Sequence, residues 1–168
     1  MPEITLPSPV GPLSLVEEHG HITRLGWYAA TRSVETKLLR EARRQLAAYF
    51  AGKLREFDLP LSLAGSPFQQ RVWQAMQHIP FGATRSYGEL AHETDSAPRA
   101  VGYACATNPI AIIVPCHRVL AAGQRIGGYS GGEGLATKRR LLELEGAPPA
   151  MRQELPLFRT RAVAEAAS

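Results

Sequence analysis

The pattern of hydrophobic and polar positions near the start of the chain predicts a β-hairpin. Residues 13–17 and 22–28 are short runs rich in branched and aromatic side chains, and Gly20 lies between them. Two such runs around a glycine turn are typical of paired antiparallel strands. A further strand is expected at residues 59–63, where leucines alternate with smaller or polar residues.

A helical repeat separates these strands. Ser33 is a suitable N-cap, and Gly52 suits the position after the last turn. A helix is therefore predicted over residues 33–50. Its apolar face carries five residues at helical spacing: Leu38, Leu39, Ala42, Leu46 and Phe50.

The second part of the chain reads as mostly helical. Ser66 and Pro67 form a good start for a helix over residues 68–78. Two short helices are predicted at residues 86–93 and 98–107, and the brief turn between them suggests a helix-turn-helix. The apolar run 111–114 predicts a buried extended segment, and a last helix is expected over residues 136–145.

These elements predict two domains. Residues 1–64 form a small α/β domain with a sheet and a helix, and residues 65–150 form a mostly α domain, followed by a tail at 151–168. The N-terminus lacks the basic and apolar segments of a signal peptide, and no apolar run is long enough to cross a membrane. A cytoplasmic protein is the expectation.

Charge adds a weak indication of the partner. The net charge is +4 and arginines supply most of the positive charge. Arginine suits bidentate phosphate contacts and stacking on bases, which favours nucleic acid. The same bias is also expected from genome composition alone, so both interpretations stay open.

The two cysteines, Cys105 and Cys116, differ in their neighbours. Neither their number nor their spacing predicts a disulfide framework or a four-ligand zinc site. Cys116 is followed by His117, and Pro115 indicates a turn on which a histidine can reach a thiol directly or through one water. Because the thiolate is the nucleophile, a neighbouring base favours reactivity. A buried structural cysteine is the alternative for an isolated pair of this kind.

The surrounding residues favour the chemical interpretation. A glycine-rich loop at residues 127–132 lets the backbone approach a flat ligand. Glu145, on the final predicted helix, is a candidate to orient His117, as carboxylates orient catalytic histidines. A solvent-exposed carboxylate at a helix end is the alternative for Glu145.

Residues 65–146 resemble the catalytic domain of the O6-alkylguanine-DNA alkyltransferases. The similar segments are GSPFQQRVWQAMQHIPFGATRSYGELA, RAVGYACATNPI, PCHRV, GGYSGG and LLELEG. They occur in the family's order and at nearly its spacing over about half of the chain. The first 60 residues resemble the variable N-terminal domain of bacterial members only loosely.

The resemblance implies a catalytic set. Cys116 is the alkyl acceptor, His117 deprotonates it through a water, and Glu145 polarises His117. Tyr87 donates a proton or hydrogen bond to the leaving guanine, and Asn108 ties the second helix of the helix-turn-helix to the active-site segment. Each role has a structural alternative: Tyr87 as a core aromatic and Asn108 as a helix stop.

The resemblance also implies contacts to DNA. Arg99 occupies the gap left by the flipped nucleotide, with a phosphate contact as its alternative role. The remaining residues expected at the base or the DNA are Ser130, Tyr129, Val119, Ala100, Gly102, Thr84 and Ser86.

The implied function is direct reversal of DNA damage. An alkyl group passes irreversibly from O6-alkylguanine in duplex DNA to Cys116, with O4-alkylthymine left open as a second substrate. No cofactor and no metal are expected, because the zinc ligands of some family N-terminal domains have no counterpart here. The partner is double-stranded DNA, and a monomer is expected, with clustering on DNA left open.

Two departures from the family pattern concern the pocket and the DNA-binding helices. The connection from Tyr87 to Arg99 is about two residues shorter than usual, and Glu133 and Gly134 look like a small insertion near the pocket lip. Either change could alter the size of adduct that is tolerated.

Three other functions are alternatives for a sequence of this kind. The first is a lesion-binding relative without the reactive cysteine, which Cys116 argues against. The others are a helix-turn-helix regulator that senses alkylation and a cysteine hydrolase. The regulator lacks a further cysteine-rich module here, and the hydrolase lacks a recognisable oxyanion hole.

Overall fold

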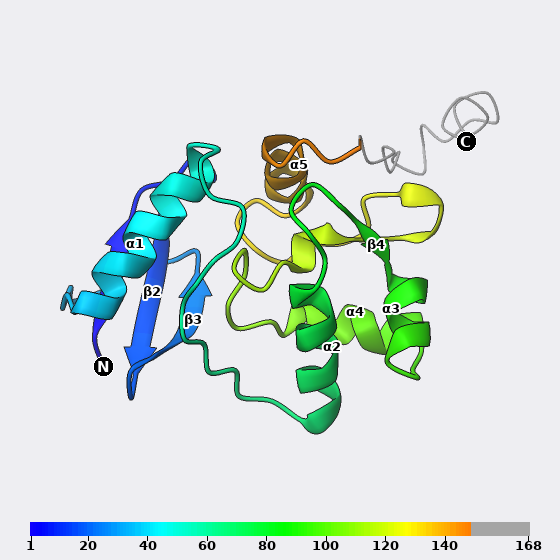
Figure 1. Ribbon diagram of the computed structural model, residues 1–168, viewed down its shortest axis with the longest axis horizontal. Helices are drawn as coiled ribbons and strands as arrows, with labels where there is room; N and C mark the ends of the chain where they lie inside the picture. Colours follow the sequence, from blue (N-terminus) through cyan, green and yellow to red (C-terminus); the bar gives the residue numbers. More distant parts are fainter. Residues whose placement is uncertain (149–168) are drawn as a thin grey trace.

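The computed structural model of the chain describes residues 1–148. The predicted tail at 151–168 lies outside the described residues. An N-terminal sheet with one helix is followed by a mostly helical part, as the sequence predicted (Figure 1). The division into domains at residues 64 and 150 stays a prediction.

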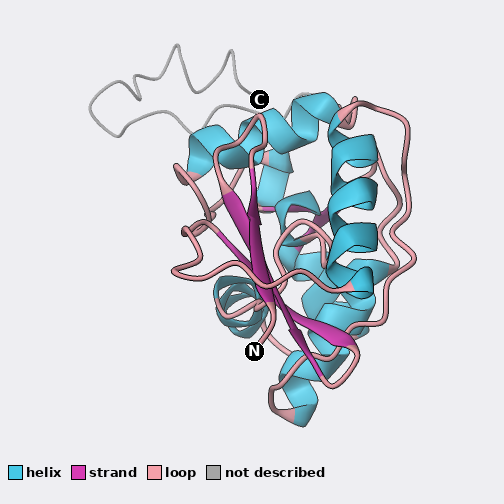
Figure 2. Ribbon diagram, turned by 90° about the vertical axis from the view of Figure 1, so that its left-hand side faces the viewer, coloured by secondary structure: helices cyan, strands magenta, loops and turns pink. Residues whose placement is uncertain are grey.

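A three-stranded antiparallel sheet forms the first layer. Its strands are β1 (Glu3–Leu6), β2 (Leu13–Glu18) and β3 (His21–Gly26), in the order β1-β2-β3. The predicted hairpin is β2 and β3, but β1 was not predicted. Its signal is the alternation of buried Ile4 and Leu6 around exposed Thr5, in a segment flanked by prolines. Figure 2 shows the strands from the N-terminal side.

Helix α1 (Lys37–Phe50) packs on this sheet and begins later than predicted. Its N-cap is Thr36, whose side chain accepts a hydrogen bond from the Leu39 N–H, and not Ser33. The cause is a backbone hydrogen bond from Val34 to Glu3, which ties residue 34 to β1 and delays the helix. The predicted apolar face is otherwise the one that packs inward: Leu39, Ala42 and Leu46 are fully buried.

Four α-helices and two short strands build the region around Cys116. Helix α2 (Pro67–Gln77) starts with a capping box at Ser66, and α3 (Tyr87–Glu93) starts with another at Ser86. Helix α4 (Pro98–Ala106) packs against α3 as in a helix-turn-helix, and α5 (Leu135–Leu144) closes the described part. Strand β4 (Arg85–Ser86) pairs in parallel with β5 (Val119–Leu120).

Two predicted extended segments are wrong. At residues 59–63 only Leu61 makes a bridge, to Ile22, because Pro60 has no N–H to continue a ladder. Residues 111–114 are buried as predicted, but they form tight turns instead of an extended run. Ile112 has a φ of 72°, and Val114 donates to the Ile110 carbonyl.

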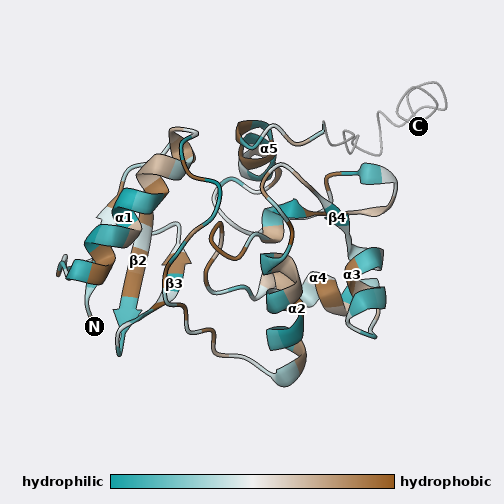
Figure 3. Cartoon of the chain, viewed as in Figure 1, coloured by the Kyte–Doolittle hydropathy of each residue, from teal (hydrophilic) through white to brown (hydrophobic). Residues whose placement is uncertain are grey.

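One continuous hydrophobic core joins the sheet, α1 and the helices of the second part. Hydrophobic stretches on β2, β3 and α4 are visible in Figure 3. Trp73 on α2 is almost fully buried, and its indole N–H donates to the Ala104 carbonyl of α4. Within residues 1–148, no helix is both long and apolar enough to span a membrane.

Candidate active site

Cys116 lies at the start of a single turn of 3-10 helix, η1 (Cys116–Arg118), directly after Pro115. The predicted turn is therefore present, and the cysteine and histidine do not alternate as they would on a strand. Cys116 is 6% exposed and lines a cavity of about 600 Å³. The other lining residues come from α3, α4 and the glycine-rich loop: Tyr87, Pro98, Arg99, Gly102, Cys105, Ala106, Gly128, Tyr129 and Ser130.

His117 is fully buried and is held by Glu145, the C-cap of α5. The distance from His117 Nε2 to Glu145 Oε2 is 2.8 Å. Burial lowers the pKa of His117, and Glu145 only partly opposes this, so the ring is neutral at pH 7. Because a carboxylate only accepts, Nε2 carries the proton and Nδ1 is the free base. Nδ1 is buried and has no hydrogen-bond partner among residues 1–148.

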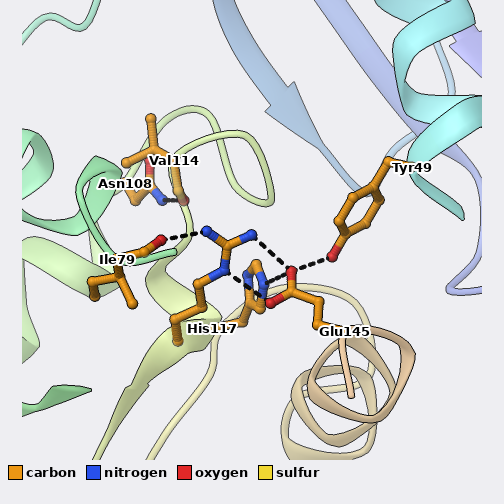
Figure 4. A network of polar contacts seen from close by, with 7 residues as sticks. Tyr49, Ile79, Asn108, Val114, His117 and Glu145 are labelled. Carbon is orange, nitrogen blue, oxygen red and sulfur yellow. Dashed lines mark hydrogen bonds and ion pairs between the residues drawn. The ribbon is translucent and has the colours of Figure 1, made fainter. Parts of the chain in front are cut away.

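Glu145 is the centre of a buried network that also includes Tyr49 and Arg118. Figure 4 shows Tyr49, His117 and Glu145 in this network. The Tyr49 hydroxyl of α1 donates to Oε2 at 2.6 Å, and Arg118 donates through Nε to Oε1 at 2.9 Å. Arg118 also donates to the Ile79 carbonyl. Burial alone would raise the pKa of Glu145, but the hydrogen bonds from His117 and Arg118, together with the charge of Arg118, lower it to about 2. The negative charge of the buried Glu145 carboxylate is therefore compensated by the hydrogen bonds it accepts and by the charge of Arg118.

The Cys116 thiol is not ionised at rest. Burial raises its pKa, while hydrogen bonding to Asn108 and the charge of Lys138 act in the opposite direction. Asn108 itself is fixed between two backbone groups: its amide donates to the Val114 carbonyl, and its oxygen accepts from the Ile110 N–H. A base is consequently needed to take the thiol proton, and His117 is the group placed next to it in the chain.

Tyr87 lies at the first position of α3 and faces the same cavity as Cys116. The pairing of β4 with β5 brings the start of α3 beside the segment that follows η1. Burial raises the pKa of Tyr87 to about 12, with a further contribution from Cys105. Its hydroxyl thus stays protonated at neutral pH and is a donor.

Lys138, on α5, is a buried cation near both groups. Its Nζ donates to the Val119 carbonyl at 2.6 Å and to the Gly128 carbonyl at 3.1 Å. It also lies 5.7 Å from the centre of the Tyr87 ring. Burial lowers the pKa of Lys138 to about 8, and the two cysteines act against this shift. Lys138 therefore ties the glycine-rich loop to the segment after Cys116 and supplies positive charge there.

The predicted DNA-contacting residues divide into two groups. Arg99, Gly102, Tyr129 and Ser130 line the cavity that contains Cys116. The remaining four do not line it. Ser86 uses its hydroxyl to cap α3, and the Val119 carbonyl is taken by Lys138. Thr84 lies in the turn before β4 and Ala100 in the first turn of α4.

Three polar residues of this site were not predicted: Tyr49, Arg118 and Lys138. Arg118 lies inside the PCHRV segment, so its position next to His117 was a usable signal. Lys138 is a lone lysine beside two arginines, which gives no signal by itself. Tyr49 lies 96 residues before Glu145, and no local pattern connects them. Among residues 1–148, no group of three or more potential ligand side chains could hold a metal ion.

Comparison with known proteins supports a common family for both parts of the chain. Residues 67–147 match the model of the 6-O-methylguanine DNA methyltransferase DNA binding domain, and residues 1–63 match that of the ribonuclease-like domain of the same proteins. A methylated-DNA–protein-cysteine methyltransferase of Mycobacterium tuberculosis is 49% identical over 150 residues, which cover 84% of this chain and 90% of the relative. The constitutive protein of that name in Bacillus subtilis is 42% identical over 154 residues, with 84% and 93% covered.

Solved structures give the same result. The structure of Mycobacterium tuberculosis OGT in complex with DNA has a TM-score of 0.79 and 47% sequence identity. The match covers 88% of this chain and 96% of the solved one. A structure of the same protein described as O6-methylguanine methyltransferase has a TM-score of 0.73 and covers 94% and 98%. The chain belongs to the methylated-DNA–protein-cysteine methyltransferases, the family that repairs DNA by moving an alkyl group from guanine to a protein cysteine.

Proposed function

We propose that Cys116 accepts the alkyl group directly from O6-alkylguanine in double-stranded DNA, and that each molecule acts once. The observation that carries this proposal is the arrangement of Cys116, His117 and Glu145 behind the cavity. Cys116 faces the cavity, and His117 is oriented by Glu145 with Nδ1 left as an acceptor. This arrangement supplies a nucleophile and a base, but no group that could release the product.

The step balances as a displacement. The Cys116 proton passes to His117 Nδ1 through a water, and the thiolate attacks the alkyl carbon. The carbon–O6 bond breaks as the sulfur–carbon bond forms. Tyr87 transfers a proton to the guanine, which leaves as the neutral base, and the proton held by His117 returns through water to restore the Tyr87 hydroxyl. The product is a thioether, which a neighbouring histidine cannot hydrolyse, so the cysteine is not regenerated.

Access to Cys116 requires that the nucleotide leave the base stack, at a cost of a few kcal/mol. Arg99 supports this step by its position at the N-terminus of α4, on the rim of the same cavity. The related protein in complex with DNA makes DNA the expected partner of this surface. Arg99 would fill the gap left by the nucleotide, and Gly102, Ser130 and Tyr129 would contact the base.

The other predicted contacts and properties belong to the same proposal. Thr84, Ser86 and Ala100 would contact the DNA outside the cavity, and Val119 would shape its wall from behind. A monomeric protein in the cytoplasm is expected. The short turn before α4, and Glu133 with Gly134, would affect the size of the alkyl group that the pocket accepts.

Transfer to Cys116 is tested with duplex DNA that contains one O6-methylguanine. Peptide mapping should find one methyl group on Cys116, and the reaction should stop at one equivalent. The Cys116→Ser variant should lose transfer and keep its affinity for the DNA. Turnover beyond one equivalent would contradict the single-use mechanism, and loss of DNA binding in the variant would indicate a structural role for Cys116.

A further inference from the structure

Cys116 borders a second, smaller cavity in addition to the one described above. Its volume is about 210 Å³. One water needs about 10–15 Å³ on the same measure, so the cavity has room for a group much larger than a water. One wall comes from the region of Cys116: Cys105, Asn108, Pro109, Ala111, Tyr129, Ser130 and Gly131. The other wall comes from strand β3 and the residue that follows it: Arg24, Leu25, Gly26 and Trp27. The N-terminal part of the chain therefore reaches the side of the reactive sulfur.

The geometry of the displacement gives this cavity a chemical meaning. In a one-step displacement, sulfur, carbon and the leaving oxygen lie on one line. The other three substituents of the carbon point sideways from that line. A hydrogen needs little room there, but a longer alkyl chain or a ring needs a space beside the sulfur. Both cavities border Cys116, and the base enters from the larger one, so such a substituent would occupy the smaller one.

Trp27 is the largest residue of the N-terminal wall, and it is held in place. Its indole N–H donates to the Val10 carbonyl at 3.0 Å. Its ring meets the ring of Tyr129 edge to face, with centroids 6.1 Å apart and an interplanar angle of 84°. Tyr129 lines both cavities, so Trp27 supports a residue of the main pocket as well as closing the smaller one.

The glycine-rich loop lies directly against the same indole. A Cβ atom added to Gly131 would lie 2.8 Å from Cη2 of Trp27, and one added to Gly132 would lie 3.0 Å from its Nε1. Real Cβ atoms essentially never approach a heavy atom closer than 3.0 Å. Residue 131 must therefore lack a side chain for the Trp27 indole to occupy its present position.

We propose that Trp27, a residue of the N-terminal sheet region, limits the size of the alkyl group that Cys116 accepts. Its ring closes the small cavity beside the sulfur and fixes the position of Tyr129 and Gly131. The inference rests on the proposed function, because it assigns the small cavity to the transferred group. Trp27 is a specificity-determining residue in this scheme and takes no part in the proton transfer.

The test compares two alkyl groups in one DNA duplex. Rates of transfer to Cys116 are measured with O6-methylguanine and O6-benzylguanine for the wild type, Trp27→Ala and Trp27→Phe. The ratio of benzyl to methyl rate should rise by roughly tenfold in Trp27→Ala, the scale of a size change in an apolar pocket. Trp27→Phe keeps a smaller aromatic ring in the wall and should give an intermediate ratio. It tests the proposal also where the alanine variant fails to fold.

Tyr28→Ala is the matched control, because it removes an aromatic ring from the next residue, which lines neither cavity. Its ratio should equal that of the wild type. A purely structural role of Trp27 would slow both transfers by the same factor. An unchanged ratio in both Trp27 variants would overturn the inference.

Gly131→Ala provides a second, independent measurement. In the wild-type background the added methyl group meets the indole, so the ratio of benzyl to methyl rate should fall. In the Trp27→Ala background the same substitution should have little effect, because the opposing ring is gone. Equal falls in both backgrounds would overturn the wall assignment. Failure of the proposed function would look different: the wild type would then transfer no methyl group to Cys116.

Discussion

Removing the hydroxyl of Tyr49 tests the network behind the active site with the smallest change. Tyr49→Phe keeps a ring that packs on Phe50, Phe57 and Phe81, and deletes only the hydrogen bond to Glu145 Oε2. Hydrogen bonds to charged groups contribute about 1.5–3 kcal/mol. Glu145 keeps its bonds from His117 and Arg118, so its charge is not left without partners.

We therefore expect the free energy of unfolding to fall by about 2 kcal/mol. For a protein of this size each kcal/mol shifts Tm by roughly 2–4 °C, which gives a fall of about 4–8 °C. Thermal unfolding followed by circular dichroism measures it. Tyr103→Phe is the control, since Tyr103 is 62% exposed and its variant should keep the wild-type Tm.

Tyr49→Phe should also change the pH dependence of alkyl transfer. Tyr49 and His117 donate to the same carboxylate oxygen, so removal of Tyr49 leaves more of its negative charge to act on His117. The pKa of His117 should rise, and the acidic limb of the rate profile should move to higher pH. A Tm within 1 °C of wild type, or an acidic limb that moves to lower pH, would refute the reasoning.

Three further predictions follow from the same geometry. Arg99→Ala should slow repair in duplex DNA by at least about tenfold and leave the reaction with free O6-benzylguanine nearly unchanged; equal slowing would remove the gap-filling role. The free energy of unfolding should fall as the pH drops below 6.5, because burial lowers the pKa of His117 in the folded state and the unfolded chain takes up the proton first. The fall should steepen below 4.5, because Glu145, with its pKa of about 2, stays ionised there only in the folded state. A constant Tm between about pH 7 and 5 would contradict the shift of His117, and a constant Tm between about pH 4.5 and 3 would contradict that of Glu145. Lys138→Met should raise the pKa of Cys116 and slow its reaction with a small thiol reagent at pH 7, by about tenfold for each unit of pKa; an unchanged rate would show that the lysine only holds the loop.

The elements with strong local signals were predictable. The cap at Ser66 and the helical spacing in α1 each depend on residues within one or two turns. The errors arise where contacts between distant backbone groups determine the local conformation. Residue 34 is tied to Glu3, so α1 cannot begin at Ser33, and Ile112 adopts a positive φ that its branched side chain disfavours.

The active site shows the same limit. Cys116 and His117 were identifiable as neighbours, and Glu145 was a reasonable partner because it ends the last helix. The hydrogen bond from Tyr49 and the contact of Trp27 with Gly131 join residues about 100 positions apart. No periodicity or spacing in the sequence encodes such contacts, because they depend on how the sheet and the helices pack.

The placement of Tyr49 and Trp27 changes the part assigned to the first 60 residues. No chemical role was predicted for this segment, yet it contributes a donor to the carboxylate behind His117 and a wall beside Cys116. Loss of a hydrogen-bond partner from a buried charge such as Glu145 is destabilising. The catalytic segment therefore depends on the N-terminal sheet and α1 for the charge state of its base. It also depends on them for the shape of its pocket, and variation in the N-terminal part is expected to alter both.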